Sequence, residues 1–167
     1  MASLFPPPEQ QPCRGGSIVV GQQPGKNTVQ SRSLPMHLHV FLDGKEQAEG
    51  RLYRDDGESL GRSTDPSTSS LLADPLETGA YSLSKLDFHS RQLTYSREAG
   101  DYRDGVAAAS VWVVGLEEAT HAVILEGQEW HMWQEEEVDK KYYVHVTNLT
   151  ISLEHSFTLT FVPVGGV

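Results

Sequence analysis

The densest group of residues that could do chemistry is Asp55-Asp56-Gly57-Glu58, with three carboxylates in four positions. Two carboxylates cleave a glycosidic bond when they face each other across a sugar, roughly 5–9.5 Å apart. Adjacent residues of a strand point to opposite faces, so Asp55 and Asp56 do not meet this requirement. Carboxylate oxygens also bind Ca²⁺, but three ligands on one short loop are too few for a site. We therefore interpret Asp55, Asp56 and Gly57 as a structural turn.

A second group is aromatic. Trp130, Trp133, Tyr142 and Tyr143 lie in an acidic stretch near the C-terminal end of the sequence. Sugar rings stack on exposed aromatic faces, and neighbouring carboxylates accept hydrogen bonds from sugar hydroxyls. Trp130, Trp133 and Tyr142 are thus candidate carbohydrate-binding residues. The competing interpretation, which we favour, is that these rings pack on the core of a β-sandwich.

Other reactive residues give weaker signals. His37 and His39 share one face of a strand and could begin a zinc site, but the sequence identifies no third ligand. With Cys13 as the single cysteine, an intrachain disulfide is excluded. No serine has a G-x-S-x-G context and no glycine loop is of the phosphate-binding type. We therefore predict neither a metal nor a cofactor, and the sequon at Asn148 makes that residue a glycosylation candidate.

The elements that position these residues read as short strands. In residues 34–42, apolar Met36, Leu38 and Val40 alternate with other side chains, which is typical of a half-buried strand. The segment 133–141 is the densest in helix-forming residues, but it is mostly charged and has little to bury. Strands separated by turn residues predict an all-β fold, an antiparallel sandwich or barrel, and of these we expect the antiparallel β-sandwich. The expected strands cover residues 17–20, 34–42, 50–54, 81–89, 92–98, 109–116, 121–125, 142–147, 149–153 and 156–162.

Charge and composition exclude several classes of partner. The chain has 167 residues and a formal net charge of −10, which repels the phosphates of nucleic acids and anionic membrane surfaces. The longest mainly apolar run, residues 106–116, is far shorter than the roughly 20 residues of a membrane span. Residues 1–12 lack the basic and apolar regions of a signal peptide. Neither nucleic acid nor a membrane is therefore an expected partner.

The order and spacing of several motifs resemble the C-terminal region of glycoside hydrolase family 31, in particular the acid and intestinal maltase type of α-glucosidase. The resemblance is strong across residues 14–60 and looser towards the C-terminus. The matching pieces are Arg14-Gly15-Gly16-Ser17-Ile18, Gln23-Pro24-Gly25, Thr28, Ser31-Arg32, Pro35-Met36, residues 38–42 and 44–50, Asp55-Asp56-Gly57-Glu58-Ser59-Leu60, and Gly79-Ala80-Tyr81.

The resemblance implies an arrangement of domains. The turn formed by Arg14, Gly15 and Gly16 would end a proximal β-sandwich, and the Asp55-Asp56-Gly57 turn would belong to a distal one. Both would follow a (β/α)₈ barrel that holds the catalytic aspartates. We thus expect residues 1–33 to be a Pro-rich leader, an orphan strand and a linker left from the proximal domain, and residues 34–167 to be the distal β-sandwich.

The nucleophile motif of the family, of the Trp-x-Gly/Asp-x-Asn type, has no match in the sequence, so we assign no catalytic residue. The implied function is an accessory scaffold fragment of an α-glucosidase, with the barrel and α-glucans as partners. By the same resemblance the parent enzyme would lie in the secretory pathway, the lysosome or the extracellular space. The alternatives are a stand-alone carbohydrate-binding module and a complete small hydrolase.

Overall fold

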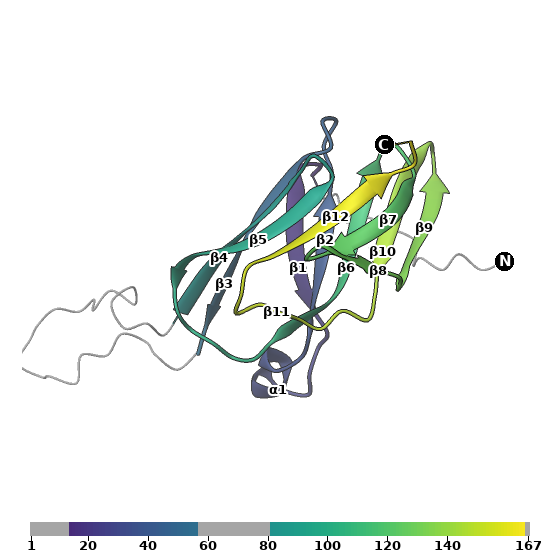
Figure 1. Ribbon diagram of the computed structural model, residues 1–167. Coiled ribbons are helices and arrows are strands. Elements are labelled where there is room, and N and C mark those ends of the chain that lie inside the picture. The colour runs from purple at the N-terminus through teal and green to yellow at the C-terminus, as the bar shows by residue number, and fades with distance from the viewer. Residues whose placement is uncertain (1–13, 57–80, 166–167) are drawn as a thin grey trace, which may run out of the picture.

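A computed structural model describes residues 14–56 and 81–165 of the chain, which Figure 1 shows in colour. The described residues are almost entirely β-structure, as the sequence predicts, with one short helix, α1 (Thr28–Arg32). The strands are β1 (Ser17–Gln22), β2 (Met36–Phe41), β3 (Ala48–Asp55), β4 (Tyr81–His89), β5 (Gln92–Gly100), β6 (Ala107–Leu116), β7 (Thr120–Leu125), β8 (Gln128–Trp130), β9 (Trp133–Val138), β10 (Lys141–Val146), β11 (Ile151–Ser152) and β12 (Phe157–Pro163).

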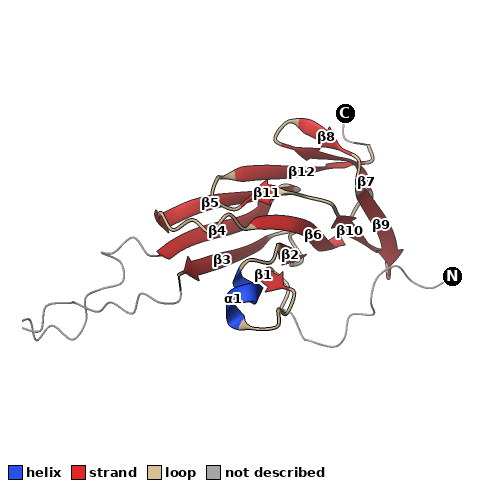
Figure 2. Cartoon of the chain, turned by 90° about the horizontal axis from the view of Figure 1, so that it is seen from below, coloured by secondary structure: helices blue, strands red, loops and turns tan. Residues whose placement is uncertain are grey.

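The strands form one sheet in the order β8-β7-β12-β5-β4-β3-β1-β2-β6-β10-β9, with β11 paired to β6. The sheet curls back on itself, so that its two halves become the layers of a β-sandwich (Figures 1 and 2). Two pairings, β1 with β3 and β2 with β6, are parallel. The sheet is therefore mixed, where the sequence predicted an antiparallel one.

The core lies between the two layers and is built by alternation along the strands. In β2, Met36, Leu38 and Val40 are buried while the residues between them are half-exposed. The opposite layer contributes Phe88 and Phe161, whose ring centroids are 5.8 Å apart. Each large apolar side chain buried in this way stabilises the fold by about 1.5–3 kcal/mol. Further fully buried core residues are Leu86, Leu93, Val111, Val113, Leu116, Val144, Leu153 and Leu159.

Strand β1 corrects one expectation. It is not an orphan strand, because it pairs with β2 over six positions and lies next to β3. Its approach to β3 depends on Gly50, because a Cβ atom on that residue would lie 2.5 Å from the Ile18 carbonyl oxygen, so only glycine allows the two strands to come so close. β1 thereby buries Ile18 in the core. The division of the chain into domains at residues 33 and 34 stays a prediction.

The expected linker after β1 contains helix α1. Its N-cap is Asn27, whose Oδ1 accepts a hydrogen bond from the Gln30 amide at 2.8 Å, as a capping side chain should. The Gln22 amide group at the end of β1 donates to the Leu34 carbonyl at 2.5 Å, which closes the loop that carries the helix. Within the described part of the chain, no helix is long and apolar enough to cross a membrane.

The two ends of the sheet come close together because β8 and β9 are joined by only two residues. The Thr120 amide at the start of β7 donates to the carboxylate of Glu135 in β9 at 2.7 Å. The Thr147 amide after β10 donates to the Met132 carbonyl between β8 and β9 at 2.8 Å. These bonds link the ends of the sheet without pairing β8 with β9. Residues 133–138, where the sequence is rich in helix formers, are a strand.

Candidate functional site

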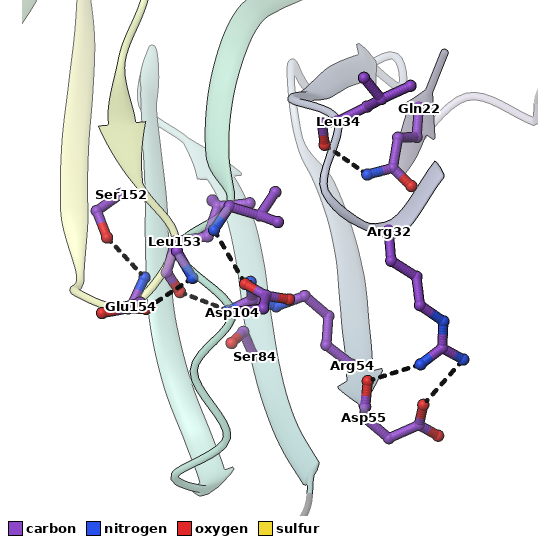
Figure 3. A network of polar contacts seen from close by, with 12 residues as sticks. Gln22, Arg32, Leu34, Arg54, Asp55, Ser84, Asp104, Ser152, Leu153 and Glu154 are labelled. Carbon is purple, nitrogen blue, oxygen red and sulfur yellow. Dashed lines mark hydrogen bonds and ion pairs between the residues drawn. The ribbon is translucent and has the colours of Figure 1, made fainter. Parts of the chain in front are cut away.

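A pocket of about 190 Å³ opens at the end of β3 where α1 meets the loop between β5 and β6. Its lining combines aromatic rings with charged groups, which is the mixture found in many binding sites for small polar molecules. Figure 3 shows the polar network around it. We call it the rim pocket; it is lined by Gln22, Arg32, Met36, Tyr53, Arg54, Asp55, Tyr102 and Asp104.

Arg54 forms the buried wall of the rim pocket, with a side chain only 5% exposed. Its Nη1 pairs with Asp104 Oδ1 at 2.5 Å, and its Nη2 donates to the Leu153 carbonyl at 2.9 Å. The same oxygen of Asp104 accepts the Val106 amide at 3.0 Å, which fixes the carboxylate. Among the described residues, Arg54 Nε has no hydrogen-bond partner. Asp104 therefore compensates the charge of Arg54, but the Nε–H donor of the arginine remains unpaired within the described part of the chain.

The outer wall of the pocket is a second, more exposed pair. Arg32, in the last turn of α1, donates from Nη1 to the Asp55 carbonyl at 3.3 Å. Its Nη2 lies 3.6 Å from the Asp55 carboxylate, and both side chains are almost half-exposed. Solvent screens such a pair, so it adds little stability. What it does is hold the helix against the end of β3.

Two tyrosines complete the pocket. Tyr53 stacks on Tyr81 with centroids 5.9 Å apart, yet its side chain is 54% exposed. Desolvation, followed by the negative charge of Asp55, raises the pKa of Tyr53 above its usual value. Desolvation and the charge of Asp104 do the same for the pKa of Tyr102. Phenols are protonated at neutral pH even without such a shift, so both hydroxyls can act as hydrogen-bond donors.

A second candidate surface is the outer side of the sheet over β1, β2, β6 and β10. His39, Trp112 and His145 lie in register on three neighbouring strands, and the His145 ring stacks on Trp112 at 3.6 Å between centroids. Val19 on β1 adds an apolar side chain that is 47% exposed. We call the half-exposed patch formed by these four residues and Tyr143 the aromatic face.

The aromatic face is partly withdrawn from water. Burial, and next the charges of His37 and His39, lower the pKa of His145 to about 4. Burial and His37 also lower the pKa of His39. His37 itself is held by Ser110, whose hydroxyl oxygen lies 2.7 Å from the His37 Nδ1. All three imidazoles lie on one face, but the described residues contain no group of three His, Cys, Asp or Glu arranged to hold a metal ion.

A second hollow, of about 270 Å³, is lined by acidic residues of the β2–β3 turn, β3 and β4, including Asp43, Glu49 and Asp87. Asp43 accepts the backbone amides of Lys45 and Gln47 at 2.8 and 3.0 Å. The hydrogen bond from Gln47, followed by that from Lys45, lowers the pKa of Asp43. A general acid needs the opposite shift, so Asp43 serves the turn rather than proton transfer.

The aromatic residues predicted to bind carbohydrate are only partly brought together. Trp130 in β8 donates its indole N–H to the Thr147 carbonyl at 3.1 Å, next to the end of β10 where Trp133 pairs with Val146. Tyr142 lies at the other end of the β9–β10 hairpin. All three rings are half-buried and pack against the core. Their role in carbohydrate binding stays a prediction.

The predicted turn residues lie where the chain changes direction. Gly16 has a φ of +86° and its carbonyl accepts the Glu49 amide at 3.2 Å, while a Cβ on Gly15 would lie 3.0 Å from the Leu42 carbonyl oxygen. The Arg14 carbonyl oxygen accepts a hydrogen bond from the Ser17 hydroxyl.

The other predicted turn and the glycosylation candidate lie elsewhere on the chain. Asp55 ends β3 and Asp56 follows it, whereas Gly57 lies outside the described residues. Asn148 is exposed, with a φ of +57°.

The rim pocket was not predicted from the sequence, although one signal for it was present. In β3, Gly50, Leu52 and Arg54 share the face that points to the core. An arginine at an inward position requires a buried carboxylate, because an unpaired charge is too costly to bury. That rule predicts a partner but not its identity, since Asp104 is 50 residues away in the sequence.

Comparison with known proteins gives the relationship of the chain. No family model matches it. The intestinal sucrase-isomaltase of Rattus norvegicus is 26% identical over 154 residues, covering 89% of this chain and 8% of the relative. An α-glucosidase of Schizosaccharomyces pombe is 31% identical over 115 residues, covering 69% of this chain and 10% of the relative. Another protein of that yeast, similar over 116 residues, is described as an uncharacterized family 31 glucosidase.

The solved structures agree on the fold. The α subunit of glucosidase II superposes with a TM-score of 0.67 at 22% identity, covering 89% of this chain and 17% of the glucosidase chain. The present chain thus spans a small share of the length of each of these relatives. The homologues of this chain are therefore glycoside hydrolase family 31 α-glucosidases, of which it matches only a small part.

Proposed function

We propose that this chain is the C-terminal accessory part of a family 31 α-glucosidase, a β-sandwich scaffold whose parent enzyme hydrolyses terminal α-glucosyl linkages of oligosaccharides. The observation that carries the proposal is the asymmetry of the matches. The sucrase-isomaltase match takes in 89% of this chain but only 8% of the relative. In this proposal bond cleavage belongs to the catalytic (β/α)₈ domain, which is the partner of this chain.

The chemistry of the described carboxylates supports a role without catalysis. A retaining glycosidase needs two carboxyl groups about 5–5.5 Å apart that both face the sugar, one of them with a raised pKa. In the rim pocket, Asp55 and Asp104 are each paired with an arginine. The carboxyl group of Asp43 is held by backbone amides in a turn. These groups position the chain rather than exchange protons with a substrate.

We assign contact with the catalytic domain to the aromatic face. Half-exposed Trp112 and Tyr143 give it rings that bury a large area on binding, and Val19 adds an exposed apolar group. Its histidines His39 and His145 have lowered pKa values, so the face is uncharged at neutral pH. An uncharged aromatic patch on a chain of net charge −10 is suited to a protein partner.

The test is fragment complementation. The 167-residue chain is co-expressed with a family 31 α-glucosidase that lacks the matching segment, and turnover of a chromogenic α-glucoside is measured. We expect activity from the pair and none from this chain alone. Val19→Asp should abolish the recovery, whereas Val164→Asp, at a 61% exposed valine beyond β12, should not. Turnover by this chain alone would contradict the proposal and establish a small hydrolase.

A second test of the accessory role is made on the transcript and needs no purified protein. Sequencing of the transcript upstream of the Met1 codon should reveal an in-frame (β/α)₈ barrel. A stop codon immediately upstream, together with failed complementation, would favour the stand-alone carbohydrate-binding module through Trp130, Trp133 and Tyr142.

A further inference from the structure

The charges that line the rim pocket cancel. Arg54 is neutralised by Asp104 and Arg32 by Asp55. A site for an anion would present an uncompensated arginine, and a site for a cation an uncompensated carboxylate. The remaining lining is uncharged, and the chain as a whole carries −10, which further disfavours anions. The ligand that fits this balance is neutral and rich in hydrogen-bonding groups.

We propose that the rim pocket binds one neutral hexopyranose unit, the glucosyl end of an α-glucan. The volume of about 190 Å³ corresponds to the space of roughly six waters, which is room for a single sugar ring and not for an oligosaccharide. The remaining glucose units of the α-glucan would extend from the pocket opening into solvent. Any neutral hexose satisfies the chemistry of the pocket; the choice of glucose rests on the proposed function.

The hydrogen-bonding groups of the pocket match those of a sugar. Arg54 Nε is a buried donor without a partner among the described residues, an unfavourable arrangement in the wall of the pocket. The hydroxyls of Tyr53 and Tyr102, both in the lining of the pocket, are protonated at neutral pH, as phenols ordinarily are, and can donate hydrogen bonds. Planar arginine and carboxylate groups present paired donors and acceptors, which suit the adjacent hydroxyls of a pyranose.

The aromatic contribution comes from Tyr53. One face of its ring is stacked on Tyr81, and the side chain is more than half exposed. The C–H face of a pyranose packs on such a ring in the same way that an apolar group does. Tyr81 is buried and belongs to β4, so it holds the Tyr53 ring in place before the ligand arrives. Stacking and hydrogen bonding thus converge on one small volume.

The experiment is a titration of the ¹⁵N-labelled 167-residue chain with maltotriose, followed by amide chemical shifts. We expect shifts at Arg32, Tyr53, Asp55, Tyr102 and Asp104, with a dissociation constant on the order of 1 mM, since a single-ring contact contains few atoms. Glucuronate, a charged sugar of similar size, should bind more weakly than glucose.

Variants at exposed positions separate binding from folding. Tyr53→Ala should weaken maltotriose binding about fivefold, whereas Tyr53→Phe, which keeps the ring, should stay within about twofold. Arg32→Ala should also weaken binding. The matched control is Arg51→Ala, because Arg51 is likewise an exposed arginine with one ion pair, to Glu98, and does not line the pocket. Unchanged thermal midpoints would show that all four variants are folded.

Three outcomes would overturn the proposal. They are no shift with maltotriose, equal loss of binding in Arg51→Ala and Tyr53→Ala, and shifts that map to Trp130, Trp133 and Tyr142 instead. Failure here is distinct from failure of the accessory role. Tyr53→Ala should leave complementation of the catalytic domain intact, and Val19→Asp should leave maltotriose binding intact.

Discussion

The indole N–H of Trp130 donates a hydrogen bond to the carbonyl oxygen of Thr147 at 3.1 Å. Trp130 belongs to β8, the strand at one end of the sheet, whereas Thr147 follows β10, next to the strand at the other end. The bond therefore ties together two ends that no strand pairing connects. A side chain does here what hydrogen bonds between strands would do in a closed barrel.

Removal of this donor should loosen the closure. Trp130→Phe retains an aromatic ring against the core but loses the bond to Thr147, so we expect the free energy of unfolding to fall by about 1 kcal/mol. The measurement is urea denaturation followed by circular dichroism. Met132→Ala is the control, because that side chain is exposed and should change stability by less than about 0.5 kcal/mol. Equal effects would mean that the indole bond does not contribute.

The buried ion pair should dominate the stability of the pocket end of the sandwich. Arg54→Met leaves Asp104 partly buried without its cation, and we expect a loss of about 3–5 kcal/mol in thermal or urea unfolding. Arg51→Ala breaks the exposed pair with Glu98 and should cost at most about 1 kcal/mol. Comparable losses in the two variants would show that burial does not distinguish the pairs.

The stability of the chain should fall on mild acidification because of His145. Its pKa is lowered to about 4 in the folded state, from a reference value of 6.5. The unfolded chain then binds more protons than the folded one between these values, so stability is full above about pH 6.5 and declines towards pH 4. Thermal midpoints measured across this range check the slope, which His145→Gln should flatten.

Stacking on Trp112 opposes this trend, because an imidazolium ring is attracted to the face of an indole. If that attraction outweighed burial, the pKa of His145 would be raised instead. Stability would then increase as the pH falls, and His145→Gln would remove the increase. The sign of the slope therefore decides between the two effects.

Gly50 should tolerate no side chain. A Cβ atom there would meet the Ile18 carbonyl oxygen at 2.5 Å and push β1 away from β3. We expect Gly50→Ala to destabilise the fold by about 1–3 kcal/mol, measured by urea unfolding. Gly44→Ala is the matched control, since nothing lies within 4 Å of its added methyl group. A neutral Gly50→Ala would mean that β1 does not need this close approach.

The sequence predicted those strands whose signal is local. Alternation at Leu38 and Val40 located β2, and the turn near Ser90 located the β4–β5 hairpin. Strand β9 was missed because Glu135 and its acidic neighbours lack the alternation of a half-buried strand; the pairing with β10 overrides their helical preference. The position of β1 beside β3 was missed because this approach depends on Gly50, which lies far from β1 in the sequence.

The candidate sites also divide into those with a local sequence signal and those without one. The turns at Gly16 and Asp55 could be read from short motifs, because turn chemistry involves neighbouring residues. The rim pocket could not, since Arg32, Arg54 and Asp104 come from three separate elements. Their proximity is a property of the curled sheet, and no spacing in the sequence encodes it.

The acidic character of β9 has a further consequence for the behaviour of the chain in solution. β9 is the last strand of the sheet, and an outermost strand can recruit the same strand of a second molecule through its unpaired backbone groups. Residues 135–137 are all glutamates, so two copies meeting at this border would bring rows of like charge together. The opposite border, β8, is only three residues long. The like charges of β9 and the short length of β8 therefore both disfavour strand pairing between two copies of the chain.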